Sequence, residues 1–336
     1  MTGSGTVLDP YVLYNAADLQ GITDYQAWYE VANDIDCSVI ANFAPLFQVD
    51  WFEGHFDGKG FLISNLHMSL SGDDGDISIG LFAGVNNGTI TDVHLRDVVI
   101  EGWDFYWMGT LIGFAMGDNL TSPATFISDC DVTGEMYGDA SYGTWPCIGG
   151  LAGYGDGNYD RCWTDVAITS DLGWSVLAGL CGETYEAHWS QCFALGDITD
   201  LGTDGSAVCG AFGFMSWGGV SCDGLLVEDC YSRCNLVGSV PEDNYADGLS
   251  TIIGGGHGHP VEVRRFYSTG SNNNADDVEY YPNGEWDADG WGGWCVTIED
   301  CYWDAETVGL LLFGVGEGKT TAQMKTKSTF AGWDIV

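Results

Sequence analysis

A short context around cysteine recurs along the chain and constrains the fold more than any other feature. "ISDCDV" (127–132), "YDRCWT" (159–164) and "VEDCYS" (227–232) are three of its copies. In chain order, the recurring position holds Val93, Cys130, Cys162, Cys192, Cys230, Phe266 and Cys301. Successive positions are 37, 32, 30, 38, 36 and 35 residues apart. A constant segment at a slightly irregular period of this length indicates stacked structural units joined by loops of variable length.

A second segment, apolar and bounded by glycine, alternates with the first. Its copies are "GLFAG" (80–84), "GTLIGF" (109–114), "GGLAG" (149–153), "LAGLCG" (177–182), "VCGAFG" (208–213) and "TIIGGG" (251–256). Both segments are short, rich in β-branched or aromatic residues, and limited by Gly, Asn or Asp, which is typical of strands. Such strands bury their inner faces only when neighbouring units stack. The sequence therefore predicts an all-β solenoid.

The cysteines mark one rung of this stack. Neighbouring coils lie about 4.8 Å apart, so one residue type at one rung position forms an inward row. Val93 and Phe266 take the place of cysteine in the same series, which apolar packing tolerates and a bonded framework does not. We therefore expect a row of free, buried thiols, with one or two disulfides and a metal site as the alternatives. Cys181 and Cys209 are expected to form a second, shorter row.

The two segments together resemble the GLUG-motif repeat proteins. "GLFAGVNNGTITDVHL" (80–95) and "VEDCYSRCNLVG" (227–238) are the best copies, and "GSGTVLDPYVLYNAADLQGI" (3–22) and "GKTTAQMKTKSTFAGWDIV" (318–336) are similar to the family's usual ends. The resemblance implies a single right-handed parallel β-helix of the kind found on microbial surface, adhesin-like and virion-associated proteins. It supplies no catalytic residues.

The resemblance and the repeat spacing predict one domain over 1–336 with short helical caps and long decorating loops. We expect an N-terminal cap and first rungs over 1–79, GLUG-like repeats over 80–305, and a C-terminal cap over 306–336. Asn15 is placed to N-cap a short helix near the start, and Thr320 or Thr321 one near the end. Helices at both ends would cover otherwise open strand edges.

The charge excludes one class of partner. The chain has 49 acidic and 9 basic residues, a formal net charge of −40. Nucleic-acid binding requires clustered Lys and Arg, so we expect no nucleic-acid partner. Strong acidity is typical of adaptation to salty or cation-rich surroundings. No apolar stretch of membrane-spanning length and no signal peptide is visible, so we expect no membrane span.

Tryptophans among glycines and acids are the candidate contact residues. "EGWDFYWMG" (101–109) and "NGEWDADGWGGWC" (283–295) contain Trp103, Trp107, Trp286, Trp291 and Trp294. Exposed Trp beside carboxylates suits sugar stacking, and it equally suits a subunit interface, where aromatic residues are enriched. Loops folded back onto the solenoid are the structural alternative. We expect carbohydrate or interface contacts at these positions.

The residues also bear on calcium binding and on glycan cleavage. "SGDDGDIS" (71–78) gathers Asp73, Asp74 and Asp76, a weak calcium candidate without the spacing of an EF-hand. No other cofactor is expected. Hydrolysis needs two carboxylates and a lyase needs a basic residue, but 49 acids make carboxylate pairs uninformative. We therefore expect a protein that is not an enzyme, with a glycan hydrolase or lyase as the minority alternative.

The expected function is that of a structural or adhesive surface protein. The absence of a visible signal peptide favours a bacteriophage or virus virion component, such as a decoration, fibre or spike subunit. Its partners would then be other virion or surface proteins, a second copy of itself, or a host-surface glycan. The alternatives are a secreted microbial adhesin that binds glycans and a tailspike-like polysaccharide depolymerase. The expected location is the virion surface, the extracellular space or the cell surface.

Overall fold

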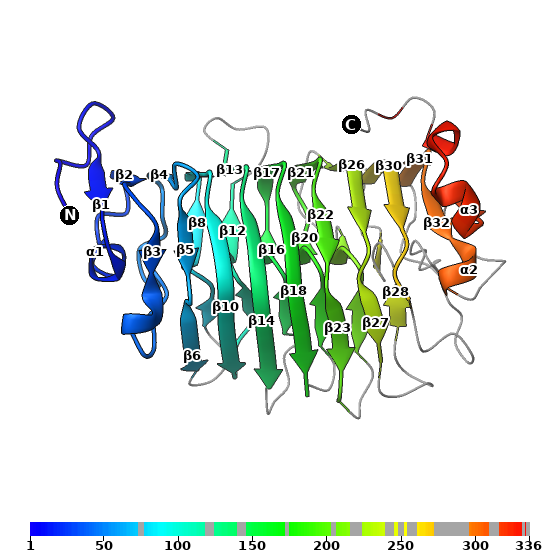
Figure 1. Ribbon diagram of the computed structural model, residues 1–336, viewed down its shortest axis with the longest axis horizontal. Helices are drawn as coiled ribbons and strands as arrows, with labels where there is room; N and C mark the ends of the chain where they lie inside the picture. The colour runs from blue at the N-terminus through cyan, green and yellow to red at the C-terminus, as the bar shows by residue number, and fades with distance from the viewer. Residues whose placement is uncertain are drawn as a thin grey trace.

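Parallel strands make up most of the protein. The computed structural model describes residues 1–72, 77–117, 124–139, 146–171, 175–202, 206–215, 224–238, 245–247, 252–253, 261–271, 296–308, 316–330 and 333. Within these residues the strands form one large sheet and two smaller ones. Corresponding strands of successive repeats lie side by side in order, for example β10 (His94–Trp103), β14 (Asp131–Asp139) and β18 (Trp163–Ser170) (Figure 1). Each repeat therefore extends the sheets in the same direction.

The two smaller sheets contain the glycine-bounded segments. One contains β7 (Ser78–Ile79), β11 (Trp107–Gly109), β15 (Cys147–Gly149), β19 (Val176–Ala178), β24 (Ala207–Cys209) and β28 (Tyr245–Asp247). The other contains β8 (Phe82–Asn86), β12 (Ile112–Met116), β16 (Ala152–Gly155), β20 (Cys181–Thr184), β25 (Phe212–Met215) and β29 (Ile252–Ile253). Each glycine-bounded segment thus contributes one strand to each of these two sheets.

The large sheet contains the strands on either side of the recurring cysteine. They are β1 (Tyr11–Leu13), β2 (Trp28–Val31), β3 (Ile35–Asp36), β4 (His55–Asp57), β5 (Leu62–Ser64), β6 (His67–Ser71), β9 (Thr89–Thr91), β10 (His94–Trp103), β13 (Phe126–Ser128), β14 (Asp131–Asp139), β17 (Gly157–Asp160), β18 (Trp163–Ser170), β21 (Ala187–Ser190), β22 (Phe193–Leu195), β23 (Asp197–Asp200), β26 (Leu225–Ser232), β27 (Asn235–Val237), β30 (Val261–Ser268), β31 (Val296–Glu299), β32 (Tyr302–Asp304) and β33 (Glu317–Lys319). Their pairings are parallel, for example β10 with β14 and β14 with β18.

Short helices lie at the two ends. Near the N-terminus are α1 (Ala16–Gln20) and the 3₁₀ turn η1 (Cys37–Val39); near the C-terminus are α2 (Ala305–Val308), α3 (Thr321–Met324) and η2 (Lys327–Phe330). The side chain of Asn15 accepts a hydrogen bond from the backbone N–H of Asp18 and begins α1. Thr320 and Gln323 form a capping box that begins α3. Each cap satisfies an N–H group that the first turn leaves unpaired.

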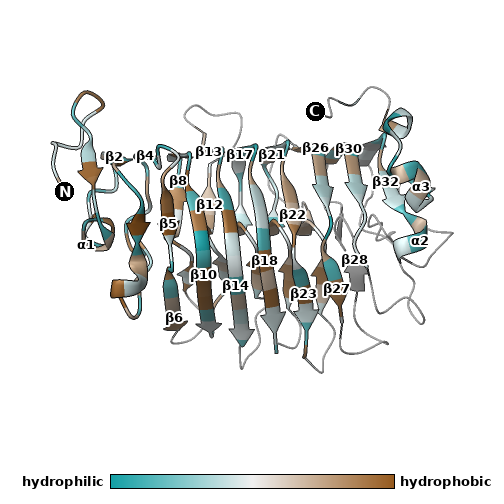
Figure 2. Cartoon of the chain, in the orientation of Figure 1, coloured by the Kyte–Doolittle hydropathy of each residue, from teal (hydrophilic) through white to brown (hydrophobic). Residues whose placement is uncertain are grey.

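The core lies between the sheets. Buried and less buried side chains alternate along much of β10 and β14, and teal and brown bands follow one another along β10 (Figure 2). The positions of the cysteine series are all at most 2% exposed. All ten cysteines within the described residues are free. The backbone N–H of Cys162 donates to Cys192 Sγ at 3.4 Å, and Cys230 pairs directly with Phe266. The series is thus one inward row.

The all-β, parallel part of the expected fold is confirmed. The sheets of the described residues are not closed into a single coil. No helix among these residues is long and apolar enough to span a membrane.

Candidate functional site

Side chains from the two smaller sheets meet on the side that faces away from the core. Along β12, β16 and β20, the residues Phe114, Tyr154 and Glu183 occupy one register position. All three are half-buried, whereas Ile112, Ala152 and Cys181 on the same strands lie in the core. Together with Trp107, Asp156 and Tyr185 they form what we call the aromatic–carboxylate cluster.

Glycine explains how the two smaller sheets come close enough to form this cluster. A Cβ atom placed on Gly153 would lie 2.4 Å from the backbone N of Met108, and one on Gly113 would lie 2.8 Å from the backbone N of Ile79. A real Cβ atom essentially never lies within 3.0 Å of a backbone atom of another residue in this way. The glycine within the repeated apolar segment is therefore required by backbone packing, which brings the outward side chains of both sheets together.

Glu183 is held by aromatic donors. The indole N–H of Trp107 donates to Glu183 Oε2 at 2.9 Å, and the phenol of Tyr185 donates to Glu183 Oε1. The thiol of Cys147 lies 3.8 Å from Oε2 as a weak donor. The carboxylate thus fixes the orientation of Trp107, two repeats earlier, and of Tyr185 in its own repeat.

Asp156 is held by the backbone of the next repeat. Its Oδ1 accepts from the N–H groups of Tyr185 at 2.9 Å and Glu186 at 3.1 Å, and its Oδ2 accepts from the Tyr154 hydroxyl at 2.8 Å. Burial raises the pKa of Asp156 to about 6, although all three hydrogen bonds oppose this shift. Desolvation of the carboxylate therefore outweighs its donors.

The rings of the cluster pack on one another both edge to face and face to face. Trp107 and Tyr154 lie edge to face, with centroids 5.8 Å apart and planes at 72°; Tyr154 and Tyr185 do so at 5.6 Å and 82°. Phe114 packs against Trp107 at 4.6 Å and against Tyr154 at 4.7 Å. The half-exposed ring of Trp51 contacts Phe114 at 5.1 Å and extends the surface. The result is an aromatic surface with a carboxylate at its centre.

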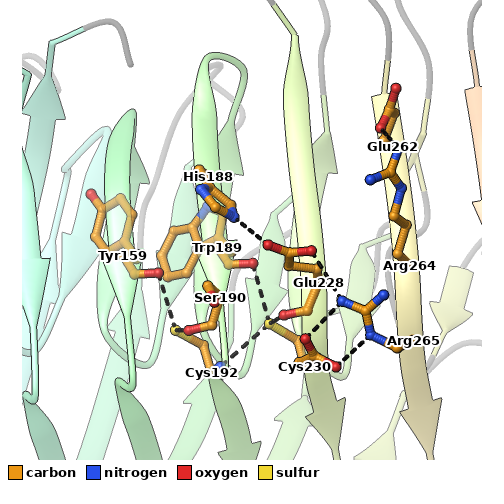
Figure 3. A network of polar contacts seen from close by, with 11 residues as sticks. Tyr159, His188, Trp189, Ser190, Cys192, Glu228, Cys230, Glu262, Arg264 and Arg265 are labelled. Carbon is orange, nitrogen blue, oxygen red and sulfur yellow. Dashed lines mark hydrogen bonds and ion pairs between the residues drawn. The ribbon is translucent and has the colours of Figure 1, made fainter. Parts of the chain in front are cut away.

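A second polar network lies on the outer side of the large sheet, and it is self-contained. His188 Nε2 lies 3.0 Å from Glu228 Oε1, and Arg265 donates to Glu228 at 3.0 Å and to both oxygens of Asp229 at 2.6 and 2.8 Å (Figure 3). Arg264 pairs with Glu262 on the same strand. Opposite charges here neutralise one another across neighbouring strands, which is the arrangement of a structural network.

An aromatic stack follows the cysteine series by one residue. Its rings lie nearly parallel, at 5.6 Å between Trp163 and Phe193, 4.5 Å between Phe193 and Tyr231, and 4.7 Å between Tyr231 and Tyr267. The guanidinium of Arg96 covers the Trp163 end at 5.5 Å. The Tyr267 end is covered by Phe330 and Trp333 of the C-terminal segment. Ring faces within this stack are occupied by other rings, so it is a structural feature of the sheet.

The structure places the expected contact residues as follows. Trp107 belongs to the aromatic–carboxylate cluster, whereas Trp103 is a half-buried residue at the end of β10 in the large sheet. Trp286, Trp291 and Trp294 lie outside the described residues, as do the calcium candidates Asp73, Asp74 and Asp76. Within the described residues, no group of three or more His, Cys, Asp or Glu side chains is arranged to hold a metal ion.

Sequence reasoning missed the partners of Trp107. Tyr154, Glu183 and Tyr185 follow glycine-bounded segments, one and two repeats after Trp107. Because these residues follow repeated segments that stack on one another, their place in the repeat is a signal that could have identified them as neighbours. Asp156 gives no such signal, because its burial depends on the packing of the following repeat.

Comparison with known proteins shows that solved structures share the fold of this chain. No protein-family model matches the chain. Halomucin of Haloquadratum walsbyi is 30% identical over 169 residues, which is 45% of this chain and 2% of halomucin, so the chain spans a small part of that relative. Among solved structures, a Bacteroides ovatus protein provisionally named an immunoglobulin A1 protease matches with a TM-score of 0.60 and 16% identity, over 99% of this chain and 90% of that one. A structure named IgA1 protease matches with a TM-score of 0.58 and 12% identity, over 96% of this chain and 24% of that one.

These matches correct one expectation. The sequence favoured a protein that is not an enzyme, and the likeness to two structures with the name of an enzyme contradicts it. The physical reason is that the repeats report architecture, and a parallel-stranded scaffold of this kind carries catalytic and non-catalytic sites alike. At 16% and 12% identity the likeness shows the fold alone, so no catalytic residue is transferred to this chain.

Proposed function

We propose that the protein is a surface-displayed module that binds glycans at the aromatic–carboxylate cluster. Its sheets would be the walls of one right-handed parallel β-helix of the GLUG type. The in-register addition of one strand to each of the two smaller sheets by each repeat supports that architecture. A scaffold of this kind presents a fixed row of side chains to a long ligand.

The observation that carries the proposal is the fixed orientation of half-exposed aromatic rings by Glu183 and Asp156. Sugar rings bind to proteins by placing their C–H faces on aromatic rings while nearby polar groups bond their hydroxyls. Rings that are already held lose little conformational entropy when a ligand arrives. The cluster has both kinds of group: Trp107 and Phe114 provide the aromatic rings, and Tyr154 and Tyr185 provide the hydroxyl groups.

The net charge of the chain and its similarity to halomucin support a surface or extracellular setting. A net charge of −40 keeps a displayed protein soluble and repels polyanions. Halomucin, the matched relative, would then share a surface or secreted setting with this chain. The virion setting stays a prediction; particle composition and gene neighbourhood test it. Calcium binding also stays a prediction, because its candidate residues lie outside the described part.

Binding to a glycan array, followed by calorimetry with the best oligosaccharide, tests the proposal. We expect Trp107→Ala to weaken binding about fivefold or more, taking the stacking of a sugar ring to be comparable with that of a base on an aromatic side chain, about 1–3 kcal/mol. Trp103→Ala is the matched control, because Trp103 is half-buried, lies a few residues away, and is outside the cluster. Equal loss in both variants, or no glycan bound by the wild type, would contradict the proposal. Release of reducing ends during the same incubations would reveal cleavage.

A further inference from the structure

The charge at the cluster is unbalanced. Within the described residues, every ion pair of a Lys or Arg side chain lies outside the cluster, for example Arg161 with Asp129 and Arg265 with Asp229. None of these pairs includes Glu183 or Asp156. The donors to Glu183 are two neutral aromatic groups and a thiol. Glu186 is half-buried and lies close enough to Asp156 for its negative charge to act on that carboxylate.

The ring geometry favours the same kind of ligand as the charge. The negative face of an aromatic ring attracts a cation within about 6 Å of its centroid. Trp107 and Tyr154 lie edge to face, as do Tyr154 and Tyr185, and both Trp107 and Tyr185 donate a hydrogen bond to Glu183. The outer stack of Trp163 and Tyr267 lacks this property, because its rings cover one another and Arg96 already occupies one end. Among the described residues, the cluster is thus a negatively charged site with aromatic walls and without a Lys or Arg partner.

We infer, building on the proposed glycan-binding function, that the ligand is a glycan with protonated amino groups, that is, an unacetylated amino-sugar polymer. Its ammonium group would lie beside Glu183 and Tyr154. Its ring would lie against Trp107 and Phe114. Glycans with carboxylate or sulfate groups are disfavoured by the same charges. N-acetylated glycans keep the ring and lose the cation, so they retain only the aromatic part of the interaction.

Calorimetry with matched oligosaccharides separates these contributions. The probes are β-linked glucosamine hexamers, the fully N-acetylated hexamer of the same linkage, and a uronic-acid hexamer. We expect the glucosamine hexamer to bind at least tenfold more tightly than the acetylated one, and the uronic-acid hexamer not to bind. Glu183→Gln should reduce the affinity for the glucosamine hexamer about tenfold more than the affinity for the acetylated hexamer, because the amide oxygen can still accept from Trp107 whereas the charge that pairs with the ammonium group is lost. Glu135→Gln, which removes the same charge from an exposed position on β14, should change neither.

The outcomes distinguish the inference from the function on which it rests. Equal affinity for both hexamers overturns the inference and leaves glycan binding intact; no binding of any hexamer overturns both. A lysine tetramer that competes as well as the glucosamine hexamer, unaffected by Glu183→Gln, would show general attraction of cations and overturn the inference. If Glu183→Gln fails to fold, the affinity of the wild type for the glucosamine hexamer is measured at increasing pH. It must fall as the amino groups of the hexamer lose their protons, and an affinity that does not change overturns the inference.

Discussion

The guanidinium of Arg161 forms two hydrogen bonds with the carboxylate of Asp129 in the preceding repeat, Nε to Oδ1 at 2.6 Å and Nη2 to Oδ2 at 2.7 Å. This pairing holds the pKa of Asp129 below its usual range. Both residues directly precede a position of the cysteine series, and both have a left-handed backbone, with φ of 51° and 54°. The same conformation recurs before each of the seven positions, at Asp92, Asp129, Arg161, Gln191, Asp229, Arg265 and Asp300.

The left-handed corner predicts where glycine stabilises the protein. The left-handed conformation costs a residue other than Gly, Asn or Asp roughly 1 kcal/mol. The side chain of Gln191 is exposed, so its removal loses few contacts, and Gln191→Gly should raise the free energy of unfolding by about 0.5–1 kcal/mol. Arg161→Gly should gain less, because it also loses the pair with Asp129, which is worth at most about 1 kcal/mol at this exposure.

Urea denaturation of the two variants beside the wild type measures the difference. A loss of stability in Gln191→Gly would show that the corner is not strained. Gln191→Asn is the control, since Asn accepts the left-handed region more readily than Gln and keeps a side chain at the corner.

A buried hydroxyl without a partner predicts a second stabilising change. Tyr159 is fully buried, and its hydroxyl has no hydrogen-bond partner among the described residues. Its ring stacks on Trp189 at 3.7 Å with planes at 4°. Tyr159→Phe keeps the stack and removes the desolvated group, so stability should stay equal or rise by about 1 kcal/mol.

Tyr154→Phe is the matched comparison, because its hydroxyl donates to Asp156 at 2.8 Å. This variant should lose about 1 kcal/mol. Thermal melts of both proteins test the contrast, and a Tyr159→Phe variant that melts well below the wild type would mean that its hydroxyl is hydrogen-bonded in solution.

The sequence predicted the stacking of strands because that information is repeated. The recurring context, with Val93 and Phe266 in place of cysteine, predicts an inward row at constant spacing, and these residues do lie buried in register. The expected second row of Cys181 and Cys209 is wrong. Cys181 on β20 pairs with Ala152 and Phe212, whereas Cys209 on β24 pairs with Ala178 in the other small sheet. A bend within each glycine-bounded segment separates the two cysteines, and periodicity alone does not show that bend.

Of the residues in the aromatic–carboxylate cluster, the sequence predicted only Trp107 as a contact residue. Its partners come from later repeats, and which side chains meet depends on how closely the glycines let two sheets approach. Among 49 acidic residues, nothing local distinguishes Glu183 and Asp156 from the others. The burial that sets them apart is a property of the assembled stack.

The cysteine row predicts a pattern of tolerated substitutions. Cys192 is fully buried, and its neighbours in the row are Cys162 and Cys230. Cys192→Val should change the free energy of unfolding by less than about 1.5 kcal/mol, because the row already accepts Val93. Cys192→Ser should cost about 1–3 kcal/mol, since it buries a more polar group.

Denaturant titration of both variants tests this order, together with thiol counting. The wild type should show at least the ten free thiols of the described residues when unfolded, and almost none when folded, because burial raises the pKa of thiols such as Cys37 to about 12. Fewer than ten thiols after unfolding without reductant would mean that at least one of these ten cysteines is disulfide-bonded.

Asp156 predicts how stability depends on pH. Its pKa is raised by burial to about 6, from a usual value of 3.8, so the folded protein retains a proton on this group between those values that the unfolded chain releases. Stability from this group is therefore greatest below about pH 4, falls as the pH rises towards 6, and is constant above that. The full penalty is on the order of 1–3 kcal/mol.

Asp156→Asn should remove this dependence. The amide oxygen of Asn can still accept from the N–H groups of Tyr185 and Glu186, while no charge is buried. The variant should thus be more stable than the wild type at pH 8 and about equal to it at pH 4, as measured by urea denaturation at pH 4, 5, 6 and 8. A difference between the two proteins that is the same at every pH would mean that Asp156 does not titrate in this range, because only a shifted pKa makes that difference depend on pH.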